Sequence, residues 1–272
     1  MTGGISLYRS AATVWPLALA VGLLLGSFCN VVALRWSSGR GLAWSARSRC
    51  PNCRRILVWY ELIPLMSFLV LRGRCRRCQR RINVRYPLIE LLMASVVGLI
   101  AARYGLTLQA LILVGLASCL LVAALVDSQQ WLLPDQLLGL GAFVSVLGEL
   151  VVGQANLSRL ATEGIGGSWV IGGLLGFGML GGLFVLTRGR GLGLGDVKLA
   201  AVLGLSLGGV GLLLTLGLAF VTGALVGVLG LITQRWTLKT AIPFGPFLIG
   251  AWTIVVLWGH ELAPWYTTAI GL

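Results

Sequence analysis

Cys50-Pro51-Asn52-Cys53 and Cys75-Arg76-Arg77-Cys78 lie in a basic stretch that interrupts an otherwise apolar chain. The run from Arg35 to Arg85 contains 13 arginines and one acidic residue, Glu61. One apolar segment precedes this stretch, at 11–34, and several others follow it from residue 86 onward. The pattern predicts a basic insertion between membrane helices, and its charge indicates the side of the membrane on which the insertion lies.

The bulk composition supports a membrane protein. Hydrophobic residues make up 57% of the 272-residue chain and charged residues 11%, and the mean hydropathy is +0.94. A soluble domain cannot hide that much apolar surface. The apolar runs do not alternate with a period of two residues, which argues against β-strands. We therefore predict an all-α polytopic membrane protein whose 39 glycines allow close helix packing.

Apolar runs of about 20 residues predict about eight membrane spans. The run 197–233 is too long for one ordinary helix, and Ser206–Gly209 is the expected turn within it. The predicted parts of the chain are the first helix at 1–34, a cytoplasmic zinc-binding loop at 35–85, and the remaining helices at 86–272. The predicted spans are 11–34, 86–103, 106–126, 132–153, 167–187, 195–209, 210–233 and 241–261.

The distribution of basic residues predicts the orientation of these spans. Short loops rich in arginine and lysine stay on the cytoplasmic side, so we expect the loop 35–85 to be cytoplasmic. Counting spans from there puts Asp127–Gln130, Gly191–Asp196, Arg235 and Lys239 on the same side. The loops assigned to the outside carry few basic residues, which are Arg103 and Arg159. This bias accounts for most of the net charge of +13, so nucleic acid is not an expected partner.

Two of the eight acidic residues reach the same depth at the cytoplasmic face. Asp127 closes the third predicted span, and Asp196 opens the sixth in Gly193-Leu194-Gly195-Asp196. Two adjacent carboxylates share a proton, so one can activate water while the other polarises an amide carbonyl. This is the chemistry of aspartic proteases. The alternative interpretation is that both are ordinary aspartates at helix ends.

Other charged residues compete for a role in the same region. Asp135 lies eight residues after Asp127 and is the rival for the first catalytic position, although Pro134 before it also fits the first turn of a helix. The roles of Glu90, Glu149 and Lys198 stay open from the sequence.

The two cysteine pairs predict a metal site. Cys50, Cys53, Cys75 and Cys78 supply four thiolates in two C-x-x-C knuckles, which suit tetrahedral Zn²⁺. Four cysteine ligands leave no position for water, so we expect a structural zinc site. Disulfides are disfavoured because the loop is expected to face the reducing cytosol. Cys29 and Cys119 fall within apolar helices and are expected to be small core residues.

Taken in order, the motifs of the chain resemble those of the type IV prepilin peptidases, the prepilin leader peptidase/N-methyltransferase family. The resemblance covers nearly the whole chain. Its motifs here are Gly26–Val32 with Arg35, Ser48–Cys53, Trp59–Ser67, Leu71–Cys75, Arg85–Glu90, Asp127 with Leu133-Pro134-Asp135, and Gly193–Leu199.

The resemblance implies a membrane-embedded aspartic endopeptidase of the bacterial inner membrane. Such an enzyme cuts the short basic leader from prepilins or pseudopilins on the cytoplasmic side. The family's catalytic pair corresponds to Asp127 and Asp196. Many members then methylate the new N-terminus with S-adenosylmethionine, and the methylation-linked positions correspond to Glu61, Gly73 and Arg74. Some members carry lysine at the position of Arg74, and Trp36-Ser37-Ser38 replaces a proline-containing continuation of the first span.

Two other functions remain open from the residues alone. Intramembrane acids and glycine-broken helices also suit an ion-coupled transporter, and the zinc loop also suits a noncatalytic scaffold of a secretion or pilus system. The lipid bilayer is an expected partner in every case. The sequence does not indicate which prepilins are cut, whether the system serves pili, secretion or DNA uptake, or how many copies associate.

Overall fold

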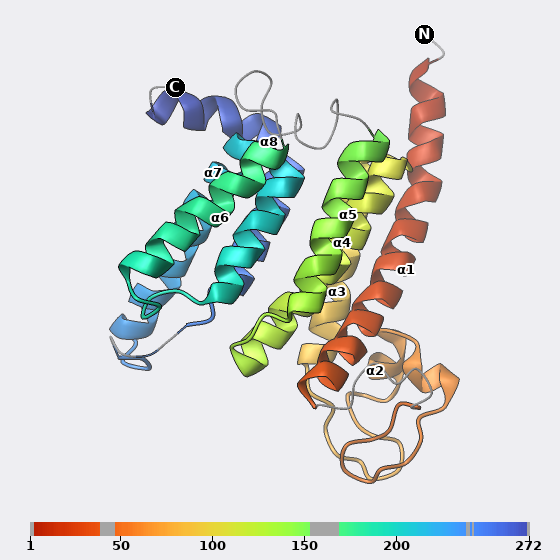
Figure 1. Cartoon of the computed structure of the whole chain (residues 1–272). Coiled ribbons are helices and arrows are strands. Elements are labelled where there is room, and N and C mark those ends of the chain that lie inside the picture. The colour runs from red at the N-terminus through yellow and green to blue at the C-terminus, as the bar shows by residue number, and fades with distance from the viewer. Residues whose placement is uncertain (1–2, 39–46, 153–168, 238–239, 241, 271–272) are drawn as a thin grey trace. The chain divides into compact units, whose positions relative to one another are not determined.

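The computed structural model describes residues 3–38, 47–152, 169–237, 240 and 242–270, so the predicted loop positions Arg159 and Lys239 lie outside it. Within these residues the chain is helical, and it has two isolated β-bridges in place of strands. It divides into two compact units, Met1–Leu106 and Thr107–Leu272, which are drawn in Figure 1.

The elements are α1 Gly3–Ser37, η1 Trp59–Leu62 (a 3₁₀ helix), α2 Met66–Val70, α3 Arg85–Tyr104, α4 Leu108–Gln130, α5 Asp135–Val152, α6 Trp169–Leu186, α7 Leu194–Ile232 and α8 Gly245–Ile270.

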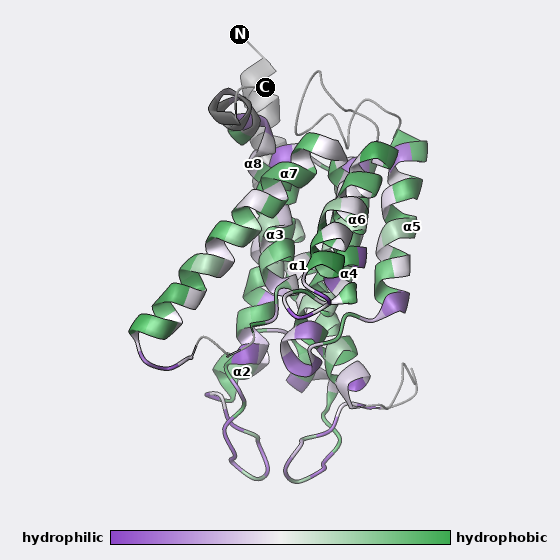
Figure 2. Ribbon diagram, turned by 60° about the vertical axis from the view of Figure 1, so that its left-hand side comes forward, coloured by the Kyte–Doolittle hydropathy of each residue, from purple (hydrophilic) through white to green (hydrophobic). Residues whose placement is uncertain are grey.

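The prediction of an all-helical membrane protein is confirmed. Among the described residues, six helices are long and apolar enough to cross a membrane, and each predicted span falls on a helix. Figure 2 shows hydrophobic residues along these helices, whereas the two knuckle loops are largely hydrophilic. The expected turn at Ser206–Gly209 is a kink inside α7, because Gly208 has non-helical angles there (φ 71°, ψ −175°).

Unit 1 is built on the packing of α1 against α3. Gly22 and Gly26 lie one turn apart on α1, where a side chain would collide with α3. A Cβ added at Gly22 would lie 2.5 Å from Ala94 Cα, and one at Gly26 would lie 2.8 Å from Glu90 Cα. Small residues at this spacing allow the backbones of membrane helices to touch. The zinc loop connects these two helices, so their packing fixes both ends of the loop.

Unit 2 contains the remaining membrane helices. Gly172 and Gly176 of α6 lie against the α7 backbone at Gly204 and Ala200, where no side chain would fit. The first half of α7 is also joined to α8, because the Trp252 indole nitrogen donates to Ser206 Oγ over 2.9 Å in the core. Helix α7 therefore has a fixed position between its neighbours, and its N-terminus carries one of the predicted catalytic aspartates.

One boundary differs from the sequence prediction. The third span was expected to end at residue 126, but α4 continues to Gln130. It ends at Trp131, which is left-handed (φ 58°, ψ 30°) and donates its amide to Asp127 O over 2.9 Å. Asp127, which was expected to close the third span, is in the last turn of α4. The apolar count alone missed this turn because Ser128, Gln129 and Gln130 are polar.

Candidate functional site

Asp127 is a buried carboxylate in the last turn of α4. Its relative exposure is 6%, and its Oδ2 atom is buried without a hydrogen bond of good geometry. The start of α8 lies directly against this oxygen, because a Cβ added at Gly245 would be 2.7 Å from Asp127 Oδ2. A buried carboxylate oxygen without a well-formed hydrogen bond is costly, and groups kept in that state are often functional.

Asp196 lies in the first turn of α7, on a different helix from Asp127. Its Oδ2 atom accepts a hydrogen bond from the Gly193 amide over 3.1 Å, so the carboxylate caps the start of its own helix. It is half-buried and close enough to Asp127 for the two carboxylates to interact electrostatically. The structure thus brings together the two aspartates that the sequence singled out, whereas their catalytic role stays a prediction.

Asp135, the rival for the first position, has a different environment. Its carboxylate is largely exposed (72%) and forms an ion pair with Lys198 Nζ at 2.6 Å. Lys198 is two residues after Asp196, so the pair joins the start of α5 to the start of α7. This contact gives both residues a structural partner. The sequence also left the roles of two other acidic residues open. Glu149 is buried on α5. Glu90 is buried on α3, and its Oε2 atom accepts a hydrogen bond from the Leu65 amide.

The four predicted zinc ligands converge. The sulfur atoms of Cys50, Cys53, Cys75 and Cys78 all lie within 4.8 Å of one another, and those of Cys50 and Cys78 are 3.9 Å apart. Tetrahedral zinc with bonds of about 2.3 Å requires sulfur atoms about 3.8 Å apart, so the four thiols fit a Zn²⁺ ion. Cys29 and Cys119 lie on α1 and α4, away from this cluster in the sequence and outside the group of converging thiols.

The two knuckles support the metal site with additional contacts. Each C-x-x-C turn closes with an antiparallel bridge, Arg49 to Ile56 in the first and Arg74 to Arg81 in the second. Arg80 donates to Asn52 Oδ1 over 2.8 Å and so joins the second knuckle to the first. The Arg80 amide, followed by the Asn52 side chain, lowers the pKa of the Cys78 thiol to about 6. A thiol with a lowered pKa is readily deprotonated, as a zinc ligand must be.

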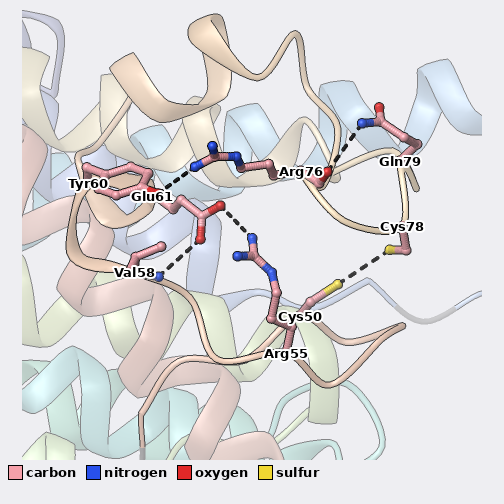
Figure 3. Close-up of polar contacts among 8 residues, drawn as sticks. All are labelled: Cys50, Arg55, Val58, Tyr60, Glu61, Arg76, Cys78 and Gln79. Carbon is pink, nitrogen blue, oxygen red and sulfur yellow. Dashed lines mark hydrogen bonds and ion pairs between the residues drawn. The ribbon is translucent and has the colours of Figure 1, made fainter.

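Glu61 is held by contacts within the loop, as Figure 3 shows. Its Oε1 atom accepts from Arg55 Nη2 at 2.5 Å, and its Oε2 atom accepts from the Val58 amide at 3.0 Å. Burial by itself would raise the pKa of Glu61, but the hydrogen bonds from Arg55 and Val58 hold this pKa below its usual value. Since Arg55 follows Cys53 by two residues, Glu61 ties η1 to the first knuckle.

The other two methylation-linked positions also have structural contacts. Gly73 has a positive φ of 67°, and a Cβ there would lie 3.0 Å from the Phe68 ring. Arg74 belongs to the bridge of the second knuckle and has an exposed side chain. Both Glu61 oxygens and Gly73 therefore make contacts within the loop itself.

The sequence reasoning missed Gly245. The residue begins α8 and lies against the Asp127 carboxylate, where any side chain would displace the acid. A signal was present, since Pro243-Phe244-Gly245-Pro246-Phe247 places one glycine between two prolines at the start of the last span. The contact between Gly245 and Asp127 could not be predicted from the sequence, because it joins segments that are far apart in the chain.

Comparison with known proteins places both units in families. Residues 20–104 match the bacterial Peptidase A24 N-terminal domain, and residues 114–228 match the type IV leader peptidase family. Similar curated proteins are named prepilin leader peptidase/N-methyltransferase. That of Pseudomonas putida is 38% identical, covering 90% of this chain and 91% of the relative. Those of Stutzerimonas stutzeri (36%, covering 92% of each chain) and Pseudomonas aeruginosa (34%, covering 93% of each) are also similar. No solved structure gives a significant match.

Proposed function

Because the chain belongs to the type IV leader peptidase family, we propose that it is an aspartic endopeptidase that removes the basic leader from prepilins or pseudopilins. The proposed site is at the cytoplasmic face of the bacterial inner membrane, where the basic loops are expected. One observation carries the proposal: Asp127, in the last turn of α4, lies near Asp196, in the first turn of α7. The burial of Asp127 gives further support, because a buried acid beside a second acid is typical of catalytic sites.

The proposed reaction needs one ionised and one protonated carboxylate. The ionised carboxylate accepts a proton from water as the water oxygen attacks the scissile carbonyl carbon. The protonated carboxylate donates a hydrogen bond to the carbonyl oxygen and stabilises the charge that develops there. Collapse of the tetrahedral intermediate then breaks the C–N bond, and a carboxyl proton passes to the leaving amine. Neither a metal nor a nucleophilic side chain takes part in this sequence.

A second activity follows from the names of the relatives. We infer that the chain also methylates the new N-terminus, because the similar curated proteins are named N-methyltransferases. S-adenosylmethionine would supply the methyl group. Glu61, Gly73 and Arg74 are proposed to support this activity by keeping the zinc loop folded, since the first two make contacts within the loop. The four cysteines are proposed to hold structural Zn²⁺.

The first prediction tests the catalytic pair. Asp127→Asn and Asp196→Asn should each abolish leader removal, because each removes one of the two carboxylates that the reaction needs. Mass spectrometry of a co-expressed prepilin measures the cleavage site and N-methylation together. Asp135→Asn is the matched control, and it should keep cleavage to within a factor of about five, because it removes only an exposed ion pair. If Asp135→Asn were inactive and Asp127→Asn active, the catalytic assignment would move by eight residues, and full activity of Asp196→Asn would remove that residue from the mechanism.

A further inference from the structure

Helix α2 exposes apolar side chains in a loop that is otherwise strongly basic. Leu69 is 60% exposed and Val70 is 74% exposed, and Met66 on the same short helix is exposed as well. The exposed arginines Arg72 and Arg74 follow directly. Adjacent apolar and cationic side chains are typical of segments that lie in the interface of an anionic membrane.

A hydrogen bond fixes the depth of α2 relative to the membrane helices of unit 1. The Leu65 amide, directly before α2, donates to Glu90 Oε2 over 2.8 Å. Glu90 lies on α3, about 7.5 Å along the helix axis from its first residue, Arg85. Helix α3 has 20 residues, about the length needed to cross the hydrocarbon core. The segment that binds Glu90 therefore starts at the level of the first two turns of a membrane-spanning helix.

Contacts in the segment just before α2 hold its position. Leu65 has an unusual backbone conformation (φ 59°, ψ −49°), and the Met66 amide donates to Pro64 O across it. Such a strained turn persists only where the surroundings enforce it, and the Glu90 contact supplies that constraint. Before the turn, η1 is tied to both knuckles by the Glu61–Arg55 and Tyr60–Arg76 contacts, which Figure 3 draws.

Helix α3 also exposes an apolar side chain at this level. Leu88 lies at the same level as the Glu90 contact and is 63% exposed, as expected of a side chain that faces lipid. Figure 1 draws α2 at the end of unit 1 where α1 ends and α3 begins. An apolar segment at this level, beside a lipid-facing helix, has acyl chains as its natural neighbour.

We propose that α2 anchors the zinc loop in the bilayer interface. Leu69 and Val70 contact acyl chains, and Arg72 and Arg74 bind the phosphates of anionic phospholipids. The anchor keeps the cysteine knuckles at the membrane surface instead of free in the cytosol. This inference does not depend on the proposed peptidase activity, because it concerns only the contacts of unit 1 with lipid.

Site-specific photocrosslinking of the full-length protein tests the anchor. The photoreactive amino acid p-benzoylphenylalanine replaces Leu69 or Val70, and the protein is reconstituted in vesicles of phosphatidylglycerol and phosphatidylethanolamine. Leu88 is the matched position for a lipid-facing residue, and the exposed Gln79 of the second knuckle is the matched position for a residue in water. After illumination, mass spectrometry of the labelled peptides measures lipid adducts, and the zinc content of each variant reports whether the loop is folded.

We expect Leu69 and Val70 to give lipid adducts at a level near that of Leu88 and several-fold above that of Gln79. Glu90→Ala should lower the adducts at Leu69 several-fold while leaving those at Leu88 unchanged, because it releases the Leu65 amide. Adducts at Leu69 and Val70 no more abundant than at Gln79 would overturn the proposal. So would adducts formed mainly with residues of unit 2, which would identify this face as a contact within the chain.

Discussion

At the scale of single residues, Gly245 controls the space around the Asp127 carboxylate. A methyl group at Gly245 would lie 2.7 Å from Asp127 Oδ2, so the acid must move to admit it. Gly250 lies on the same helix and has no atom within 4 Å of the corresponding position. These two glycines therefore form a matched pair for testing whether the position of the Asp127 carboxylate matters.

The second prediction uses this pair. Gly245→Ala should reduce leader cleavage by about 100-fold, because a displacement of about 1 Å at a catalytic group costs that much. Gly250→Ala should leave cleavage unchanged. Cleavage rates of a prepilin by the purified variants provide the measurement, with thermal unfolding as the control for folding. Equal activity of the two variants would show that the reaction does not depend on the carboxylate position in this structure.

The third prediction concerns the Glu61–Arg55 ion pair. Its hydrogen bonds hold the pKa of Glu61 below the usual value, so the pair stabilises the loop at pH values above the unfolded-state pKa of about 4.3. This stabilisation is lost as the pH falls through the folded-state pKa. Glu61→Gln should therefore destabilise the loop at neutral pH, and the difference from the unmodified protein should shrink toward pH 3.

Hydrogen exchange across Val58–Leu62 in both proteins, measured as a function of pH, checks this expectation. Acid also protonates the cysteine thiols and would release a bound metal, so the comparison uses only pH values at which both proteins have the same zinc content. Faster exchange in Glu61→Gln by the same factor at every pH would contradict an ionic role for Glu61.

At the scale of elements, the starts of α5 and α7 meet beside the candidate catalytic pair. Lys198 and Asp135 form an ion pair across this junction. Gly195 also lies so close to Leu133 that an added Cβ would be 2.9 Å from Leu133 Cβ. The turn after Asp127 is thereby attached to the first turn of α7, which carries Asp196. The spacing between the two aspartates depends on this junction.

The fourth prediction exchanges the two charges. Asp135→Lys should lower cleavage by a factor of about five, since an exposed ion pair contributes at most about 1 kcal/mol. Lys198→Asp should have a similar effect, and the double exchange should restore most of the activity. Cleavage rates of the single and double variants measure the coupling. Failure of the double exchange to recover activity, in a protein that still folds, would mean that the charges act separately.

At the scale of the whole molecule, the distribution of arginines predicts one orientation for every loop. The zinc loop and the segment with Arg188 and Arg190 are expected in the cytoplasm, whereas the turn at Gly105 is expected outside. The first matched family region ends at residue 104 and the second begins at residue 114. The gap between them contains the boundary of the two compact units, between Leu106 and Thr107.

The fifth prediction tests this orientation with reporter fusions. Alkaline phosphatase fused after Gly105 should be active, because the enzyme folds only outside the cytoplasm, and the same fusion after Arg190 should be inactive. A green fluorescent protein fusion at each position should give the opposite pattern. Phosphatase activity after Arg190 would place the Asp196 end of α7 outside and would exclude cleavage at the cytoplasmic face.

The positions of the helices and the convergence of the four cysteines were predictable because they depend on local patterns. Apolar runs of membrane length mark the spans, and two C-x-x-C pairs mark a zinc site, so these features needed no knowledge of distant contacts. The end of α4 was harder to predict, since the polar residues 128–130 continue a helix that the hydropathy pattern had ended. The cap at Trp131 decides that boundary through its left-handed conformation.

The sequence by itself determined the class of the protein, its helices, the four converging cysteines and the pair of aspartates worth testing, because each depends on residue type and spacing. Only the tertiary structure decided the neighbours of these groups: Gly245 against Asp127, Lys198 with Asp135, and Glu90 with the Leu65 amide. The physical reason is that such contacts join segments far apart in the chain. Their existence depends on how helix backbones pack, and that packing has no local signature in the sequence.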